Sequence, residues 1–109
     1  MLLNEKILSL LGFAAKAGKL SYGFEAATGA VETKKSFLVL TASDISAKTR
    51  KEIIYYADRN QVMHIALKGI DIKTLSDAVG RKCGIISVNN SGFANTCKSY
   101  IEGGIANDK

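Results

Sequence analysis

Hydrophobic residues recur along the chain at spacings that predict alternating helices and strands. From Asn4 to Ala17 they follow the 3.6-residue period of an amphipathic helix, with Asn4 as its N-cap and Gly18 just beyond its end. The same period predicts a second helix from about Gly23 to Thr33. The run FLVLTA at residues 37–42 is short, apolar and flanked by polar residues, which is typical of a strand buried on both faces.

The middle of the chain continues this alternation. Ser46 is expected to cap a helix that extends to about Arg59. The run VMHIAL at residues 62–67 is predicted to form the second strand. Asp71 is then expected to cap a short helix that Gly80 ends.

A third strand and a last helix complete the prediction. The strand is expected at residues 84–90, GIISVNN, and Ser91 is expected to cap the helix that follows. Gly103 and Gly104 should end that helix, which leaves a frayed tail within residues 102–109. Alternating helices and strands predict an α/β fold, a three-layer α/β/α sandwich with a small mixed sheet. A chain of 109 residues is the size of a single domain, so residues 1–109 are expected to form one domain.

The charge of the chain narrows its possible partners. Lys and Arg number 15 against 10 acidic residues, a net charge of +5, which attracts polyanions such as nucleic acid or anionic lipid. No apolar run approaches the roughly 20 residues that span a bilayer, and the first residues lack the long apolar region of a secretory signal. We therefore expect no membrane association, a cytoplasmic location and reduced thiols.

Candidate chemical groups are few. Cys83, Cys97 and His64 are the only cysteines and histidine, too few and too poorly spaced for a zinc site. No partner that would orient a catalytic histidine is evident, so we expect no catalytic residues, no metal and no cofactor. Cys97 falls on the apolar stripe of the last helix and is expected in the core. For Cys83 two interpretations remain: an ordinary loop thiol, or a thiol whose pKa is lowered by Arg81 and Lys82.

Two basic segments favour binding to an anionic polymer. Lys16 and Lys19 lead into the helix start at Gly23, where free N–H groups suit a phosphate. The segment Gly80–Gly84 carries Arg81 and Lys82 between glycines, whose small size would let a polynucleotide come close. The remaining basic residues are expected mostly as solvated surface charges: Lys34, Lys35, Lys48, Arg50 and Lys51.

Taken in order, three segments resemble a known family. They are AGKLSYGFEAATGAVETKKSFLVLTASDISAKTRKEIIYYA, VMHIAL and DIKTLSDAVGRKCGIISV. They are similar to the kink-turn-binding ribosomal protein superfamily of the L-seven-Ae/L-thirty-e type, and most of all to its small bacterial YlxQ-type members. The resemblance extends from about Leu8 to Ile101, and it implies an α/β/α sandwich that binds RNA along one edge. The residues that it assigns to this edge are Gly23, Phe24, Glu25 and Thr28; Ala42, Ser43 and Asp44; and Gly80, Arg81, Lys82, Cys83, Gly84 and Ile85.

One motif departs from the family pattern. Family members carry Gly-x-Asn-Glu-x-x-Lys at the start of the second helix. Here Gly23 is kept, but Glu25 replaces the asparagine, Ala26 the glutamate and Gly29 the lysine. Losing the lysine removes a phosphate contact and its share of the salt-dependent affinity.

These observations lead to one preferred function and two alternatives. The preferred function is a monomeric, non-enzymatic protein that binds structured RNA, such as a kink-turn in ribosomal or regulatory RNA, with the ribosome as a candidate partner. Lys16 and Lys19 would hold the RNA backbone. The first alternative is a protein-interaction module that kept the fold and lost kink-turn affinity. The second is an accessory domain of an enzyme, since the same fold presents substrate RNA in some methyltransferases.

Overall fold

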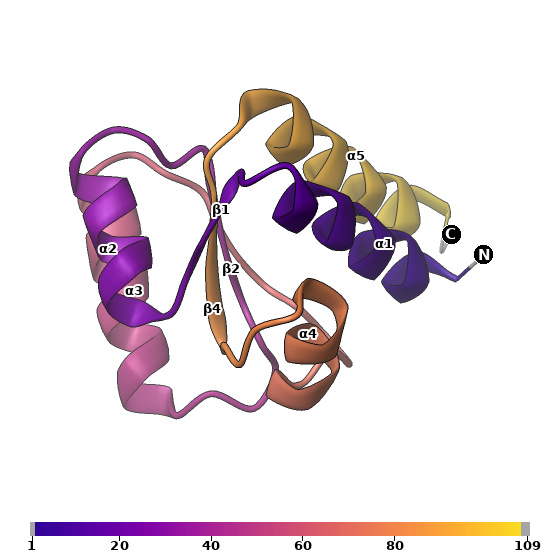
Figure 1. Cartoon of the computed structure of the whole chain (residues 1–109), viewed down its shortest axis with the longest axis horizontal. Coiled ribbons are helices and arrows are strands. Elements are labelled where there is room, and N and C mark those ends of the chain that lie inside the picture. Colours follow the sequence, from indigo (N-terminus) through magenta and orange to yellow (C-terminus); the bar gives the residue numbers. More distant parts are fainter. Residues whose placement is uncertain (1, 108–109) are drawn as a thin grey trace.

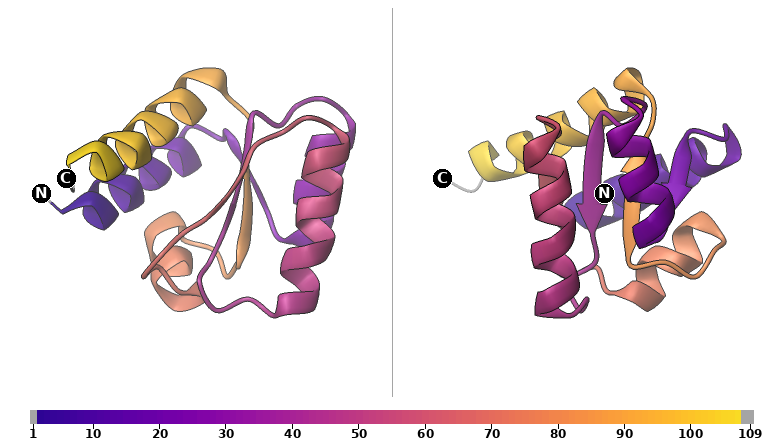
Figure 2. Two further views of the ribbon diagram at one scale, coloured as in Figure 1. Left: turned by 180° about the vertical axis from the view of Figure 1, so that it is seen from behind. Right: turned by 90° about the vertical axis from the view of Figure 1, so that its left-hand side faces the viewer.

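Five helices and a four-stranded sheet make up the part of the chain that is described. The computed structural model describes residues 2–107, with side chains for residues 2–103. In chain order the elements are α1 (Leu3–Lys16), β1 (Leu20–Tyr22), α2 (Phe24–Glu32), β2 (Leu38–Thr41), α3 (Ala47–Arg59), β3 (His64–Ala66), α4 (Ile72–Val79), β4 (Ile85–Val88) and α5 (Ser91–Asn107). Helices α2 and α3 cover one face of the sheet, and α1, α4 and α5 cover the other (Figures 1 and 2). The predicted α/β/α sandwich is confirmed.

The sheet has mixed strand directions and the order β1-β4-β2-β3. Strand β2 is parallel to β3, whereas β4 lies between β1 and β2 and is antiparallel to both. Strand β1 was not predicted, because its three residues are too few to show a two-residue period. It lies opposite β4, with Leu20 paired to Val88 and Tyr22 to Ile86.

Apolar residues fill both faces of the sheet. On β2, Leu38 and Leu40 face the core beneath α1, α4 and α5, while Val39 faces the smaller core beneath α2 and α3. On β4, Ile86 and Ile85 divide in the same way. Successive side chains of a strand point to opposite faces, so a strand covered on both sides is apolar throughout. This explains the continuous apolar runs in the sequence.

Most of the predicted helix ends are confirmed. The side chain of Ser46 accepts a hydrogen bond from the Thr49 N–H at 3.1 Å, and that of Asp71 accepts one from the Thr74 N–H at 2.8 Å. Gly80 ends α4 with a φ of 78°, a left-handed conformation that glycine adopts without strain. Within residues 2–107 none of the helices is long and apolar enough to cross a membrane.

The predicted caps of the first and last helices were wrong. Asn4 lies inside α1, and its side-chain amide donates to the Lys68 carbonyl at 3.2 Å instead of capping. At α5, the Asn90 side chain accepts from the Phe93 N–H at 2.9 Å, so the capping residue is one position before Ser91. Both errors arise because neighbouring polar residues look equally suitable as caps in a sequence.

The predicted end of the last helix was also wrong. Helix α5 continues through Gly103 and Gly104 to Asn107. A glycine inside a helix costs about 1 kcal/mol relative to alanine, which weakens the helix without ending it. Of the tail predicted at residues 102–109, residues 108 and 109 lie outside the described residues.

Candidate nucleic-acid interface

Three segments that are far apart in the sequence meet at one edge of the sheet. We call this edge the loop edge and define it as residues 23–25, 42–44 and 80–85. The Gly23 N–H donates to the Ile85 carbonyl at 2.8 Å, and the Ala42 N–H donates to the Gly84 carbonyl at 2.9 Å. The central position of β4 in the sheet accounts for this arrangement, because the loop before β4 then lies between the end of β1 and the end of β2 (Figure 1).

Hydrogen bonds fix the turn after β2 within this edge. The Ser43 N–H donates to the Ile70 carbonyl at 2.8 Å, and the Asp44 carboxylate accepts from the Ile72 N–H at 2.8 Å. These bonds tie the turn to the segment that begins α4. The carboxylate of Asp44 is therefore held in place but remains exposed.

Arg50 holds the same turn from α3. Its Nη2 donates to the carbonyls of Ala42 at 3.3 Å and Ser43 at 3.2 Å. The prediction that Arg50 is a solvated surface charge was wrong: the residue is half-buried, and its Nε is buried without a hydrogen-bond partner among the described residues. An arginine that reaches back across seven or eight positions to carbonyls leaves no signal in a sequence pattern.

The loop before β4 positions its two basic residues. The Arg81 guanidinium lies over the Tyr22 ring, 5.1 Å from its centroid, which is a cation–π contact. Burial raises the pKa of Tyr22, and the Arg81 cation partly opposes this. The Ser76 hydroxyl accepts from the Cys83 N–H at 2.9 Å and donates to its carbonyl at 3.2 Å, so the loop is anchored to α4. Tyr22 was not predicted to belong to the site.

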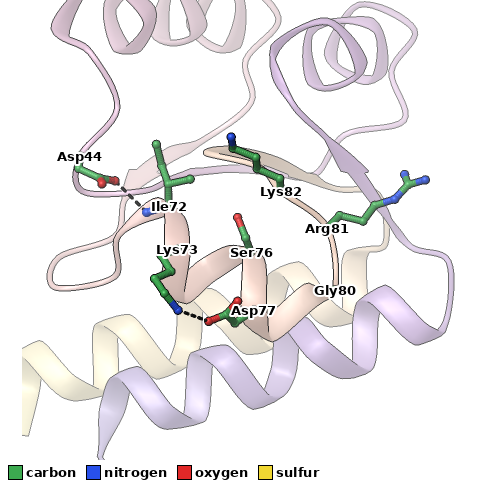
Figure 3. A pocket seen from close by; sticks show the side chains of 8 residues that line it. All are labelled: Asp44, Ile72, Lys73, Ser76, Asp77, Gly80, Arg81 and Lys82. Atoms are coloured by element: carbon green, nitrogen blue, oxygen red, sulfur yellow. Dashed lines mark hydrogen bonds and ion pairs between the residues drawn. The ribbon is translucent and has the colours of Figure 1, made fainter.

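A shallow groove of about 720 Å³ lies beside this loop. Figure 3 shows that Arg81 and Lys82 extend from the loop in different directions, while Lys73 and Asp77 pair across one side of the groove at 3.0 Å. That pair is the only ion pair among the described residues. Arg81 and Lys82 are both exposed and form no ion pair with a carboxylate there, so their charges are available to an anionic ligand.

The start of α2 adds hydrogen-bond donors to the edge. Gly23 is the N-cap, with a φ of 89°, and it offers no side chain to the first N–H groups of the helix. Uncapped N–H groups at the positive end of a helix bind anions. The exposed carboxylate of Glu25 lies within the same turn and adds an acceptor.

Two predicted contact residues of α2 make contacts within the protein. The Phe24 ring packs edge-to-face on Tyr56, with centroids 6.1 Å apart. Thr28 is buried, and its hydroxyl donates to the Glu25 carbonyl at 3.0 Å. The Thr28 side chain is therefore closed to a ligand, whereas the Phe24 ring is half-buried.

The predicted site residues therefore divide by exposure. The exposed ones are Lys16, Lys19, Glu25, Ser43, Asp44, Gly80, Arg81 and Lys82, and the half-buried ones are Gly23, Phe24 and Gly84. Those with buried side chains are Thr28, Ala42, Cys83 and Ile85. The buried residues shape the edge from within, whereas the exposed ones present groups to solvent.

Gly84 has a role in packing. A Cβ at this position would lie 2.8 Å from the Cγ2 of Ile45 and 3.2 Å from the Cγ1 of Ile72. The missing side chain thus allows close packing of the chain against itself. A side chain at position 84 would therefore meet these two isoleucines, and the close approach of a polynucleotide to this glycine stays a prediction.

Lys19 lies away from the loop edge. The Lys19 carbonyl accepts from the Asn89 N–H, just beyond the end of β4, whereas Gly23 contacts the residue at the start of β4. Four residues of extended chain separate the two ends by about 13 Å. The turn between α1 and β1 and the start of β4 are at opposite ends of the sheet (Figure 1). The structure therefore does not bring Lys19 together with Arg81 and Lys82. Lys16, at the end of α1, lines a hollow with Ala78 of α4.

The thiols are buried. Burial raises the pKa of Cys83, so the alternative of a lowered pKa beside Arg81 and Lys82 was wrong. The neighbouring cations point to solvent, while the thiol points inward. Cys97 lies in the core as predicted, and burial raises its pKa to about 11.

His64 has a structural partner. One of its ring nitrogens, Nε2, lies 2.9 Å from the Thr41 hydroxyl on the neighbouring strand. Burial lowers the pKa of His64, the Arg50 cation lowers it further, and Asp58 opposes the shift. This contact gives the histidine a structural role within the sheet. Within residues 2–107, no group of three or more His, Cys, Asp or Glu side chains is placed to hold a metal ion.

The fold and the loop edge define a class of protein. Residues 5–98 match the sequence pattern of the ribosomal protein L7Ae/L30e/S12e/Gadd45 family, and the chain belongs to this family. The family is one of ribosomal proteins, in agreement with the prediction of a non-enzymatic protein.

Individual relatives agree with this assignment. The RNA-binding protein YlxQ of Enterococcus faecium is 27% identical over 100 residues, covering 92% of this chain and 95% of that protein. The structure of a Bacillus halodurans protein of unknown function matches with a TM-score of 0.83 and 30% identity, covering 89% of this chain and 97% of that chain. The 15.5kD RNA-binding protein of Giardia lamblia shares the fold, with a TM-score of 0.72 and 16% identity over 93% of this chain and 86% of that one.

Proposed function

We propose that this protein binds structured RNA, including kink-turns, through the loop edge. One observation carries the proposal: the bonds from Gly23 to Ile85 and from Ala42 to Gly84 bring the uncapped start of α2 next to Arg81 and Lys82. Helix N–H groups and unpaired cations are the groups that bind RNA phosphates. Two of the relatives described above are named as RNA-binding proteins.

The exposed acceptors of the edge provide a means of reading bases. The carboxylates of Glu25 and Asp44 and the hydroxyl of Ser43 face solvent beside the cations. A carboxylate accepts hydrogen bonds from the N–H groups of guanine, and irregular RNA elements expose such groups where a regular A-form groove hides them. Phosphate contacts from the cations would set the orientation, and these acceptors would select the bases.

The proposal includes the cellular setting. We infer a monomer that acts in the cytoplasm on ribosomal or regulatory RNA. The small size, the basic charge and the two buried, unpaired thiols support this setting. The ribosome itself is the candidate larger partner. These statements rest on the proposed RNA binding.

Titration against two RNAs tests the proposal. One is a kink-turn hairpin, and the other is the same hairpin with its G·A pairs replaced by Watson–Crick pairs. The parent protein should prefer the kink-turn, and its affinity should fall as salt rises. Each phosphate contact contributes roughly 0.7–0.9 to the slope of log K against log salt.

Two double variants with equal charge changes locate the interface. Replacing Arg81 and Lys82 with alanine should weaken binding and reduce the salt slope. Replacing Lys19 and Lys35 with alanine removes the same charge at the far end of β4, where the Lys19 carbonyl accepts from Asn89 and the chain after Lys35 bonds Val88, and should leave binding nearly unchanged. All four residues are exposed, so both variants should remain folded, with stability changes of about 0.5 kcal/mol per site. If the parent neither prefers the kink-turn nor responds to salt, a protein-interaction module becomes the better account.

A further inference from the structure

The outer face of α3 carries a row of basic and aromatic side chains. Lys48, Lys51, Tyr55 and Arg59 are all exposed and lie three or four positions apart, so they share one face of the helix. We call these four residues the α3 stripe. No contact described above for the loop edge uses them.

Tyr55 is held in place although it is exposed. Its side chain is 58% exposed, yet its ring packs edge-to-face on Tyr56, with centroids 5.6 Å apart and planes at 77°. Its hydroxyl accepts a hydrogen bond from the Arg59 Nη1 at 3.4 Å. A restrained aromatic ring loses little conformational entropy when a flat ligand stacks on it.

Aromatic contacts connect this ring to the loop edge. Tyr55 packs on Tyr56, and Tyr56 packs edge-to-face on Phe24, the residue that follows Gly23. Helices α2 and α3 lie side by side over the same face of the sheet (Figure 2). An RNA bound at the start of α2 therefore has a short path to the α3 stripe.

The surface beside Tyr55 is hollowed and mainly basic. A hollow of about 380 Å³ is lined by Lys48, Lys51, Glu52, Tyr55 and Tyr56. The two lysine cations outnumber the single carboxylate of Glu52. Phosphates are attracted to such a surface, and a base can lie flat against the tyrosine ring.

We propose that the α3 stripe is a stacking subsite for an unpaired nucleotide of the bound RNA. The Tyr55 ring stacks the base, and Lys48 and Lys51 contact the adjoining phosphates. Stacking requires only the flat face of a base, so the subsite tolerates any sequence and recognises single-stranded character. This inference rests on the proposed RNA binding and extends it from the loop edge to α3.

Affinity measurements on the whole chain test the subsite. The probes are a kink-turn hairpin with a short single-stranded oligouridine extension at each end and the same hairpin without extensions. Tyr55→Ala should weaken binding of the extended RNA by roughly five- to hundredfold, which is the affinity that stacking of one base on an aromatic ring contributes. The affinity for the hairpin without extensions should change less. Tyr55→Phe keeps the ring and should bind like the parent.

An exposed aromatic elsewhere provides the control. Phe13 is 65% exposed on α1, on the opposite face of the sheet, and lies in a hollow with Lys16. Phe13→Ala should leave both affinities unchanged. If 5-iodouridine is placed in the extensions, irradiation should crosslink the RNA to Tyr55 in the parent and much less in Tyr55→Ala.

The outcomes separate this inference from the proposed function. If Tyr55→Ala binds the extended RNA as well as the parent, while the Arg81 and Lys82 variant is impaired, the subsite is refuted and RNA binding stands. A role of the stripe in binding another protein would give this result. If the parent binds neither RNA at low salt, the proposed function and the subsite are both refuted.

Discussion

Replacing Gly29 with lysine tests the helix and the RNA interface in one variant. Gly29 lies within α2 and is exposed, and a Cβ at this position would meet no neighbouring atom within 4 Å, so a lysine fits without a clash. Exchanging a helix-interior glycine for lysine should stabilise the fold by about 0.5–1 kcal/mol. For a domain of this size that raises Tm by about 2–8 °C. Thermal unfolding without RNA measures this effect.

The same lysine should add a phosphate contact. The family places a lysine at this position, and one further contact would steepen the dependence of log K on log salt by roughly 0.7–0.9. Glu25 lies four positions earlier on the same helix face and will compete for the new cation, since pairs at this spacing contribute about 0.2–0.5 kcal/mol. The gain in affinity should therefore be modest and should disappear at high salt.

Gly29→Ala separates the two effects. Alanine improves the helix at least as much as lysine does but adds no charge, so it should raise Tm without changing the salt slope. If lysine and alanine give equal affinities for the kink-turn at low salt, position 29 does not contact a phosphate. If neither variant raises Tm, the explanation of Gly29 as a weak point of α2 is refuted.

Two further predictions concern packing and pH. Gly84→Val should destabilise the fold by about 1–3 kcal/mol, because its Cβ would lie 2.8 Å from the Ile45 side chain. Urea unfolding measures this loss, with Gly29→Ala as the control, and unchanged stability would contradict the close packing at Gly84. Folding lowers the pKa of His64, so the unfolded chain binds that proton more tightly than the folded chain does. The free energy of unfolding that is present above about pH 6.5 should therefore be lost as the pH falls through the lower pKa of the folded state. In the same urea assay, His64→Gln should lose less stability than the parent between neutral and mildly acidic pH. A pH dependence of stability equal to that of the parent would exclude His64 as its source.

Local structure could be predicted from the order and spacing of the residues alone. Caps such as Ser46 and Asp71 bond to N–H groups three residues away, so the signal lies within one turn of the helix. Residue spacing likewise predicted the buried strands β2 and β4, because a strand covered on both faces has to be apolar at every position. The family resemblance also predicted which three segments would lie at the same edge of the sheet.

The side chains that the loop edge presents to solvent became clear only from the three-dimensional arrangement of the chain. Neighbouring residues in the loop before β4 differ in exposure: Arg81 and Lys82 face solvent, whereas Cys83 is buried. Their orientation depends on α4 and on the turn after β2, whose contacts come from segments distant in the chain. For the same reason the sequence could not place Lys19 at the other end of the sheet. A charge pattern records that a residue is basic, whereas its position relative to other charges follows from strand order and direction, which arise from contacts between remote segments.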